Sequence, residues 1–260
     1  MHLSPAWTED TLLNGRIRLR QPKDGYRVTF EPVVLAAAVP ARPGDRVADI
    51  GTGTGAAALC LLARVPNTLV IGVELQKVLA RLATINGALN GTGRRFQTIV
   101  ADVLQYTPLR RGDRETGKEW KPSPALAWST FDHVMSNPPF AAAGTPSSNP
   151  IRATAHHAVD LKAWITACVA LLRPQGSLTL IHRADALDRL LAALTGVVGG
   201  IEIIPLWPRA GLSARRIIVR GRKGSRAPPV LRTGLILHTT AGYTVEAESL
   251  LRQGNALRVT

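Results

Sequence analysis

The stretch Asp49-Ile50-Gly51-Thr52-Gly53-Thr54-Gly55 decides the fold, because its three alternating glycines follow a short apolar run and precede a helical pattern. Glycines at a turn between a strand and a helix let the backbone approach a ligand without interference from Cβ atoms. A glycine-rich turn on its own is a weak sign, so its surroundings matter. We expect a strand over 46–50, a helix over 54–65 and a nucleotide-like ligand at the turn between them.

Carboxylates at two further strand ends support this interpretation. Glu74 ends an apolar run, where it can accept hydrogen bonds from both hydroxyls of a ribose, and Asp102 follows the next run, near the place of an adenine amino group. Each acid alone could equally orient a turn, end a solvated strand or cap a helix. The glycine spacing is GxGxG. It disfavours a nicotinamide dinucleotide, whose sites have the spacing GxGxxG, with the third glycine placed to pack the helix against the strand. The candidate cofactor-binding residues are Asp49, Gly51, Gly53, Gly55, Glu74 and Asp102.

Strand and helix patterns alternate along most of the chain, which favours a parallel sheet. Further strands are expected over 69–74, 96–101, 131–136 and 177–182, and helices over 31–39, 75–89, 160–173 and from 183 to 195. The apolar runs Ile201–Leu206 and Arg216–Val219 predict an antiparallel pair that finishes the sheet, and Leu235 to His238 and a last helix around 243–252 complete the chain. The expected fold is therefore α/β, with a Rossmann-like seven-stranded mostly parallel sheet and helices on both faces.

The chain is long enough for one α/β domain with a small addition, since its 260 residues are 45% hydrophobic. Residues 13–30 alternate weakly and contain the turn signals Asn14-Gly15 and Asp24-Gly25, which predict a β-hairpin. We expect residues 1–30 to form an N-terminal hairpin extension and residues 31–260 to form the domain that carries the chemistry.

The charge of the chain indicates a polyanionic partner. Lysine and arginine outnumber aspartate and glutamate 32 to 18, giving a net charge of +14, and such a field attracts polyanions such as nucleic acid. A basic surface without any bound partner is the alternative, since net charge alone is weak evidence for a nucleic-acid partner. The basic residues cluster at Arg16, Arg18, Arg20 and Lys23, at Arg94 and Arg95, at Arg215 and Arg216, and at Arg220, Arg222 and Lys223.

Two cysteines and two neighbouring histidines are not expected to form special sites. Cys60 and Cys168 lie in apolar, helix-like segments, so we expect core cysteines rather than a disulfide framework or a zinc cluster. His156 and His157 have no ligand at metal-binding spacing, so no metal is expected. No secretory leader pattern and no apolar run of about 18 residues is visible, which predicts a cytoplasmic protein without a membrane partner.

A second motif, Asn137-Pro138-Pro139-Phe140, follows the apolar run Phe131–Met135. The prolines hold the backbone extended and offer no N–H, so the local surface is rich in hydrogen-bond acceptors. The Asn137 side-chain oxygen and the Pro138 carbonyl can each accept one hydrogen of a planar NH2 group. Phe140 offers a face to an aromatic base, a stacking worth about 1–3 kcal/mol. These four residues are the candidate catalytic residues, and the alternative is a tight turn with Phe140 in the core.

Together these motifs resemble the class I S-adenosylmethionine-dependent methyltransferases that methylate amino groups. Asp49 to Gly55 resembles their motif I, Glu74 the ribose-binding acid, Asp102 the adenine-contacting acid and Asn137 to Phe140 the NPP[YF] catalytic motif. The opening Leu12-Leu13-Asn14-Gly15-Arg16 and the Gly25-Tyr26-Arg27 element are similar to the tRNA(Val) adenine-N6 methyltransferase family. The chain departs from that family at Phe30-Glu31, where members often have Thr-Asp, and in an insertion over 110–124.

The resemblance implies S-adenosyl-L-methionine as cofactor, methyl transfer to an exocyclic amine, and RNA, specifically tRNA, as partner. A protein glutamine N5-methyltransferase remains an alternative, although such enzymes usually carry a helical domain before the core. A noncatalytic RNA-binding module with a methyltransferase-like fold and a small-molecule O-methyltransferase are two further alternatives. The sequence specifies neither the RNA, nor the nucleotide, nor the oligomeric state.

Overall fold

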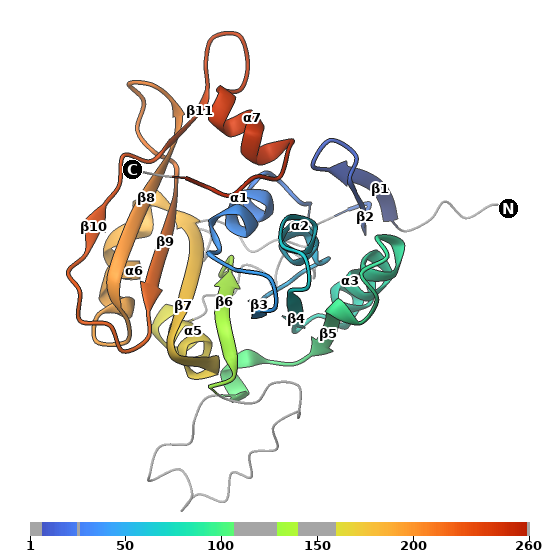
Figure 1. Cartoon of the computed structure of the whole chain (residues 1–260), viewed down its shortest axis with the longest axis horizontal. Coiled ribbons are helices and arrows are strands. Elements are labelled where there is room, and N and C mark those ends of the chain that lie inside the picture. The colour runs from blue at the N-terminus through green and yellow to red at the C-terminus, as the bar shows by residue number, and fades with distance from the viewer. Residues whose placement is uncertain (1–6, 25–26, 107–128, 140–159, 259–260) are drawn as a thin grey trace, which may run out of the picture.

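A nine-stranded sheet forms the centre of the protein. The computed structural model describes residues 7–24, 27–106, 129–139 and 160–258. The strands follow the order β10-β8-β9-β7-β6-β3-β4-β5, from left to right in Figure 1, with β11 also paired to β8. Their bounds are β3 Arg46–Ile50, β4 Leu69–Glu74, β5 Phe96–Val100, β6 Phe131–Ser136, β7 Leu172–Arg183, β8 Gly199–Arg209, β9 Arg216–Arg222, β10 Val230–Leu231 and β11 Leu235–His238. Within the described residues β9 alone runs antiparallel to its neighbours, so the sheet is mostly parallel as expected.

The expected number of seven strands is wrong, although each of the seven is present. The two additional strands, β10 and β11, lie parallel to β8, where Val230 pairs with Glu202 and Leu235 with Leu206. β10 has two residues, too short for an alternating apolar pattern to identify it, whereas β11 coincides with the segment Leu235 to His238 that the sequence marks but does not place in the sheet. Arg232, which follows β10, forms an ion pair with Glu202 of β8, so side-chain contacts across the sheet also hold this edge.

Helices cover both faces of the sheet, as expected. Their bounds are α1 Glu31–Ala38, α2 Ala56–Arg64, α3 Lys77–Leu89, α5 Leu161–Leu171, α6 Leu187–Leu194 and α7 Val245–Leu251, and short 3-10 turns lie at η1 Gly93–Arg95, η2 Val103–Tyr106 and η5 Ala184–Ala186. Successive strand residues point to opposite faces, so Val47 joins the core under α1, α2 and α7 while Ala48 joins the core under α5 and α6. Met135 and Val134 of β6 divide between the two cores in the same way.

The N-terminal hairpin lies earlier in the chain than residues 13–30. It pairs β1 Trp7–Leu12 with β2 Ile17–Pro22 around the Asn14-Gly15 turn. The sequence pattern missed β1 because the strand is apolar only at its two ends. The hairpin packs on α3, since the Asn86 side chain accepts a hydrogen bond from the Arg20 N–H at 2.7 Å and donates one to the Arg20 carbonyl at 2.8 Å. Leu19 is completely buried in the core shared with α1 and α2.

Both cysteines are buried, which confirms that they are core residues. Burial raises the pKa of the Cys60 thiol to about 12 and also raises the pKa of Cys168, so neither carries a reactive thiolate at neutral pH. In the described part of the chain, no helix combines the length and the apolar character that crossing a membrane requires.

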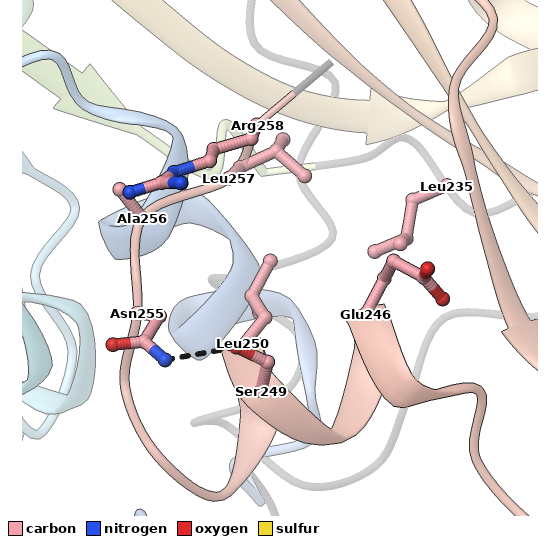
Figure 2. A pocket seen from close by; sticks show the side chains of 8 residues that line it. All are labelled: Leu235, Glu246, Ser249, Leu250, Asn255, Ala256, Leu257 and Arg258. Carbon is pink, nitrogen blue, oxygen red and sulfur yellow. Dashed lines mark hydrogen bonds between the residues drawn. The ribbon is translucent and has the colours of Figure 1, made fainter.

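A pocket lies beside α7, against the C-terminal segment (Figure 2). Leu235, Leu250 and Leu257 line it, and the Asn255 side chain donates a hydrogen bond to Ser249 Oγ at 2.8 Å. The Leu257 N–H donates to the Ala37 carbonyl of α1 at 2.9 Å, so the C-terminal segment is fastened to the helix beneath it. None of the lining residues belongs to the candidate site described next.

Candidate active site

The candidate residues that the structure describes gather at one edge of the sheet, where β3, β4, β5 and β6 end. The parallel pairing aligns Ile50 with Val73 on one side and with Ser136 on the other, and it aligns Glu74 with Val100. From β3 the chain continues to β4 on one side, whereas β6 lies on the other side. Open α/β sheets form a crevice at such a switch point, outside the carboxyl ends of the strands. The glycine turn, Glu74 and Asn137 therefore lie together at this switch point of the sheet.

The glycine turn adopts a conformation that favours glycine at each of its three glycine positions. Gly51, Gly53 and Gly55 have φ values of +74°, +57° and +86°. A Cβ atom at Gly55 would also lie 2.9 Å from the Phe96 ring, so this glycine lets α2 begin directly against β5. The N–H groups of Gly51 and Thr52 donate to the Val73 carbonyl at 2.8 and 3.0 Å, which fastens the turn to β4. A side chain at residue 55 would therefore collide with the Phe96 ring, so this position requires glycine for packing as well as for its positive φ.

Two buried carboxylates hold the glycine turn in place through hydrogen bonds. Asp49 is 2% exposed and its Oδ2 accepts a hydrogen bond from Thr52 Oγ1 at 2.6 Å. Glu74 is 7% exposed, and its Oε2 and Oε1 accept from the N–H groups of Gly53 and Gln76, each at 2.9 Å. Burial raises the pKa of Glu74, and it raises the pKa of Asp49 to about 7, with the nearby Glu74 charge adding to the shift. A carboxylate has about four lone-pair sites, so Glu74 keeps acceptor capacity for a ligand.

The raised pKa of Asp49 predicts a pH-dependent stability. The pKa in the folded state, about 7, lies above the ordinary value of 3.8, so the contribution of Asp49 is most favourable at low pH and is lost as pH rises through 7. We therefore expect the change in unfolding free energy caused by Asp49→Asn in the cofactor-free protein to be more favourable at pH 8 than at pH 5, because only the wild-type protein carries a buried charge at residue 49 at the higher pH. Chemical denaturation at the two pH values measures this difference, and an effect of equal size at both would contradict a buried, titrating carboxyl at residue 49.

Asp102 lies at the same edge but is occupied by local contacts. Its Oδ1 accepts from the Leu104 N–H at 3.0 Å and its Oδ2 from the Gln105 side chain at 3.3 Å, so it caps the short turn η2. The Ala101 N–H donates to the Glu74 carbonyl at 3.0 Å, which holds Asp102 next to the end of β4. Asp102 therefore acts as a helix cap, which was the alternative interpretation, and its contact with adenine stays a prediction.

Asn137 has a buried hydrogen-bond acceptor that no described residue uses. Its side-chain Oδ1 is buried and has no hydrogen-bond partner in the part of the chain that the structure describes. Its Nδ2 lies 3.5 Å from Oε2 of Glu31, a long hydrogen bond. Pro138 is buried and Pro139 is half-buried, and Phe140 lies outside the described residues, as do His156, His157 and the insertion over 110–124. A buried polar atom without a partner is costly, which points to a ligand that donates to it.

Sequence reasoning missed two groups of residues around Asn137. Glu31, the first residue of α1, contacts Asn137 and forms an ion pair with Arg216, the first residue of β9. Ser136 Oγ donates to the Ile50 carbonyl at 2.7 Å and accepts from Trp164 Nε1 at 3.1 Å, which ties the ends of β3, β6 and α5 together. Only the departure from Thr-Asp at Phe30-Glu31 drew attention to the first group, and no local pattern marks Trp164.

Ion pairs occupy several arginines of the basic clusters. Arg18 and Arg20 pair with Glu9 within the hairpin, at 2.6 and 3.1 Å, and Arg220 pairs with Glu202 at 2.6 Å. Arg16 donates to the carbonyls of Gln253 and Ala63 at 2.7 and 3.2 Å. The phosphate-binding capacity of these clusters is therefore smaller than their sequence suggests.

No family model matches the chain. In sequence it is similar to tRNA1(Val) (adenine(37)-N6)-methyltransferases, with 28% identity over 202 residues to that of Aeromonas hydrophila, covering 76% of this chain and 77% of the relative. The corresponding protein of Porphyromonas gingivalis is 28% identical over 239 residues and covers 88% of both chains.

Solved structures show the same fold. The crystal structure of a predicted O-methyltransferase from Agrobacterium tumefaciens has a TM-score of 0.69 and 29% identity, and covers 88% of this chain and 98% of that one. An S-adenosylmethionine-dependent O-methyltransferase from Thermotoga maritima, with a TM-score of 0.53 and 16% identity, covers 78% of this chain and 68% of its own. This second likeness concerns the fold alone.

Proposed function

We propose that the chain, which is an S-adenosylmethionine-dependent methyltransferase, methylates the exocyclic N6 amine of an adenine in a tRNA. The observation that carries the proposal is the buried Oδ1 of Asn137, which has no hydrogen-bond partner among the described residues and lies at the carboxyl end of β6, next to the end of β3 where the glycine turn begins. An adenine amino group has two hydrogens to donate in the plane of the base. Asn137 Oδ1 and the Pro138 carbonyl are the acceptors proposed for them.

The residues at the edge of β3 and β4 fit the cofactor. The turn from Gly51 to Gly55 has positive φ at its three glycines, where no Cβ atom hinders a close approach between backbone and ligand. Glu74 is proposed to accept from the ribose hydroxyls with the lone pairs that Gly53 and Gln76 leave open, and Asp102 to lie beside the adenine. S-adenosylmethionine supplies, when bound, an electrophilic methyl group on a sulfonium.

Asn137 and Pro138 are proposed to act on the nitrogen that receives the methyl group. Holding the amine by two acceptors fixes the direction of its lone pair and saves the entropy of aligning it. Transfer would form the bond from nitrogen to the methyl carbon while the carbon–sulfur bond of the sulfonium breaks and the neutral thioether leaves. The nitrogen would become cationic and would then lose a proton to water. Preorganised oxygen dipoles stabilise that developing charge better than bulk water does. Phe140 is proposed to stack on the base.

The choice of tRNA rests on the names of the relatives and on the charge of the chain. The two relatives described above, which cover 76% and 88% of this chain, are named as tRNA1(Val) adenine-N6 methyltransferases, and the net charge of +14 suits a phosphate-rich partner. A base held over Phe140 must leave its stack, which is easiest in a single-stranded loop.

Transfer of a labelled methyl group into unmodified tRNA tests the function. We expect label in tRNA, recovered as N6-methyladenosine, with weaker transfer into duplex RNA because a paired base must first be unstacked. Label recovered as glutamine N5-methyl in protein supports the glutamine methyltransferase, and label on ribose oxygen supports an O-methyltransferase. Cofactor binding without transfer to any of these acceptors supports the noncatalytic module.

Two exposed arginines offer a matched test of RNA binding. Arg209 ends β8 and Arg215 precedes β9, so both lie at the edge of the sheet that carries Asn137, and no described carboxylate forms an ion pair with either. We expect the double variant Arg209→Gln/Arg215→Gln to flatten the salt dependence of tRNA affinity, by about one unit of slope for each lost phosphate contact. Fluorescence titrations with tRNA over a range of salt concentrations give the slope.

The control removes the same charge at the opposite edge of the sheet. Arg222 ends the antiparallel strand β9 and Arg226 follows it, and both are exposed. Arg222→Gln/Arg226→Gln should leave more of the slope intact than the Arg209/Arg215 variant does. Equal slopes in the two double variants would show that the edge with Asn137 has no special part in binding RNA.

A further inference from the structure

We infer that Glu31, held by Arg216, is a positioning residue that fixes the orientation of the Asn137 amide for methyl transfer. The inference deepens the proposed function and depends on it, since it assigns a task to residues around the proposed acceptor. The contacts that carry it join three elements far apart in the sequence: the start of α1, the end of β6 and the start of β9.

The two ends of the Asn137 amide lie in different surroundings. The Nδ2 atom lies 3.5 Å from Glu31 Oε2, whereas Oδ1 is buried without a partner in the described residues. A carboxylate accepts hydrogen bonds and cannot donate them, so it favours the amide orientation in which Nδ2 faces Glu31. In the flipped orientation Oδ1 would face the carboxylate oxygen, and two acceptors would repel each other. The amide NH2 would then point at the position proposed for the substrate amine.

Glu31 is itself fixed from two sides. Its Oε1 accepts a hydrogen bond from Arg216 Nε, and Arg216 pairs in the sheet with Arg183 of β7 and Leu206 of β8. Glu31 also occupies the first turn of α1, where the helix N-terminus favours a negative charge. The Glu31 side chain is 13% exposed, so water competes weakly for the carboxylate. A carboxylate held in this way acts on the substrate only through Asn137.

Kinetics of four single variants and one double variant test this role. We expect Glu31→Ala to lower kcat for tRNA methylation at least tenfold, and Glu31→Gln, which keeps a carbonyl acceptor, to recover part of the loss. Affinity for S-adenosylmethionine should stay within twofold in both variants. In the Asn137→Ala background Glu31→Ala should add little to the loss, because residues that act as a unit are not additive. Glu202→Gln, which weakens a comparable ion pair in β8, should keep wild-type kcat.

A measurement without substrate keeps the inference testable even if tRNA is not methylated. The side-chain amide resonances of Asn137, assigned by their absence in Asn137→Ala, should shift in Glu31→Ala and stay in place in Glu202→Gln. Unchanged Asn137 amide resonances in Glu31→Ala would overturn the positioning role. So would a loss of kcat on Glu31→Ala that is as large in the Asn137→Ala background as in the wild-type protein. A wild-type protein that methylates no tRNA, with resonances that shift as expected, would overturn the proposed substrate and leave the positioning role supported.

Discussion

Asn137→Ala is expected to keep cofactor binding and to lose roughly 10²–10³ in kcat, the range measured when one preorganised group that stabilises developing charge is removed. The structure gives the reason: Asn137 Oδ1 is buried without a partner among the described residues, at the strand end next to the glycine turn. An interaction that strengthens as the nitrogen becomes cationic affects kcat rather than cofactor affinity. Single-turnover methyl transfer gives the rate, and calorimetry with S-adenosylmethionine gives the affinity.

Two outcomes would contradict this account of Asn137. Wild-type turnover in Asn137→Ala would mean that the Asn-Pro-Pro-Phe motif has been misread as catalytic. A loss of cofactor affinity as large as the loss of rate would instead make Asn137 a cofactor ligand. Pro138 cannot replace the missing acceptor, because its carbonyl is proposed to hold the other hydrogen of the same amine.

The second large effect is expected for Glu74→Gln, which should weaken S-adenosylmethionine binding by roughly 1–3 kcal/mol, as for loss of a charged hydrogen-bond acceptor. The Gly53 and Gln76 N–H groups each need an acceptor at residue 74, and both are 2.9 Å from the carboxylate. A glutamine keeps one oxygen and turns an NH2 group toward a backbone donor or a ribose hydroxyl.

Calorimetry with S-adenosylmethionine and with S-adenosylhomocysteine measures the effect of Glu74→Gln. Both affinities should fall alike, because the two compounds share the ribose. Glu202→Gln, the same chemical change in a carboxylate outside the site, should leave both affinities unaltered. Unchanged binding in Glu74→Gln would remove the ribose assignment.

The sequence predicts the sheet well where apolar runs end in marked turns. The expected strands over 46–50, 69–74 and 131–136 have the bounds of β3, β4 and β6, because each run is largely buried and its end is marked. Gly51 follows the first run, Glu74 ends the second, and Asn137-Pro138 follows the third. The polar strand β1 and the two-residue strand β10 lack such a pattern. Their pairing depends on the surfaces that they meet, which no local window contains.

The candidate site shows the same division. Asp49, Glu74 and Asn137 could be placed from the sequence because parallel strands bring their ends to one edge. Glu31 could not, since its contact with Asn137 spans 106 positions along the chain. Charge counting also overstated the free arginines, because pairing partners such as Glu9 and Glu202 are visible only in the fold.

Nucleoside mass spectrometry of tRNA from cells lacking this protein tests the central claim most directly. The proposal predicts that one N6-methyladenosine is missing from that tRNA and returns after incubation with the purified protein and S-adenosylmethionine, but not with Asn137→Ala. An N6-methyladenosine content equal to that of normal cells, together with no methyl uptake by the tRNA in vitro, would contradict tRNA adenine as the substrate.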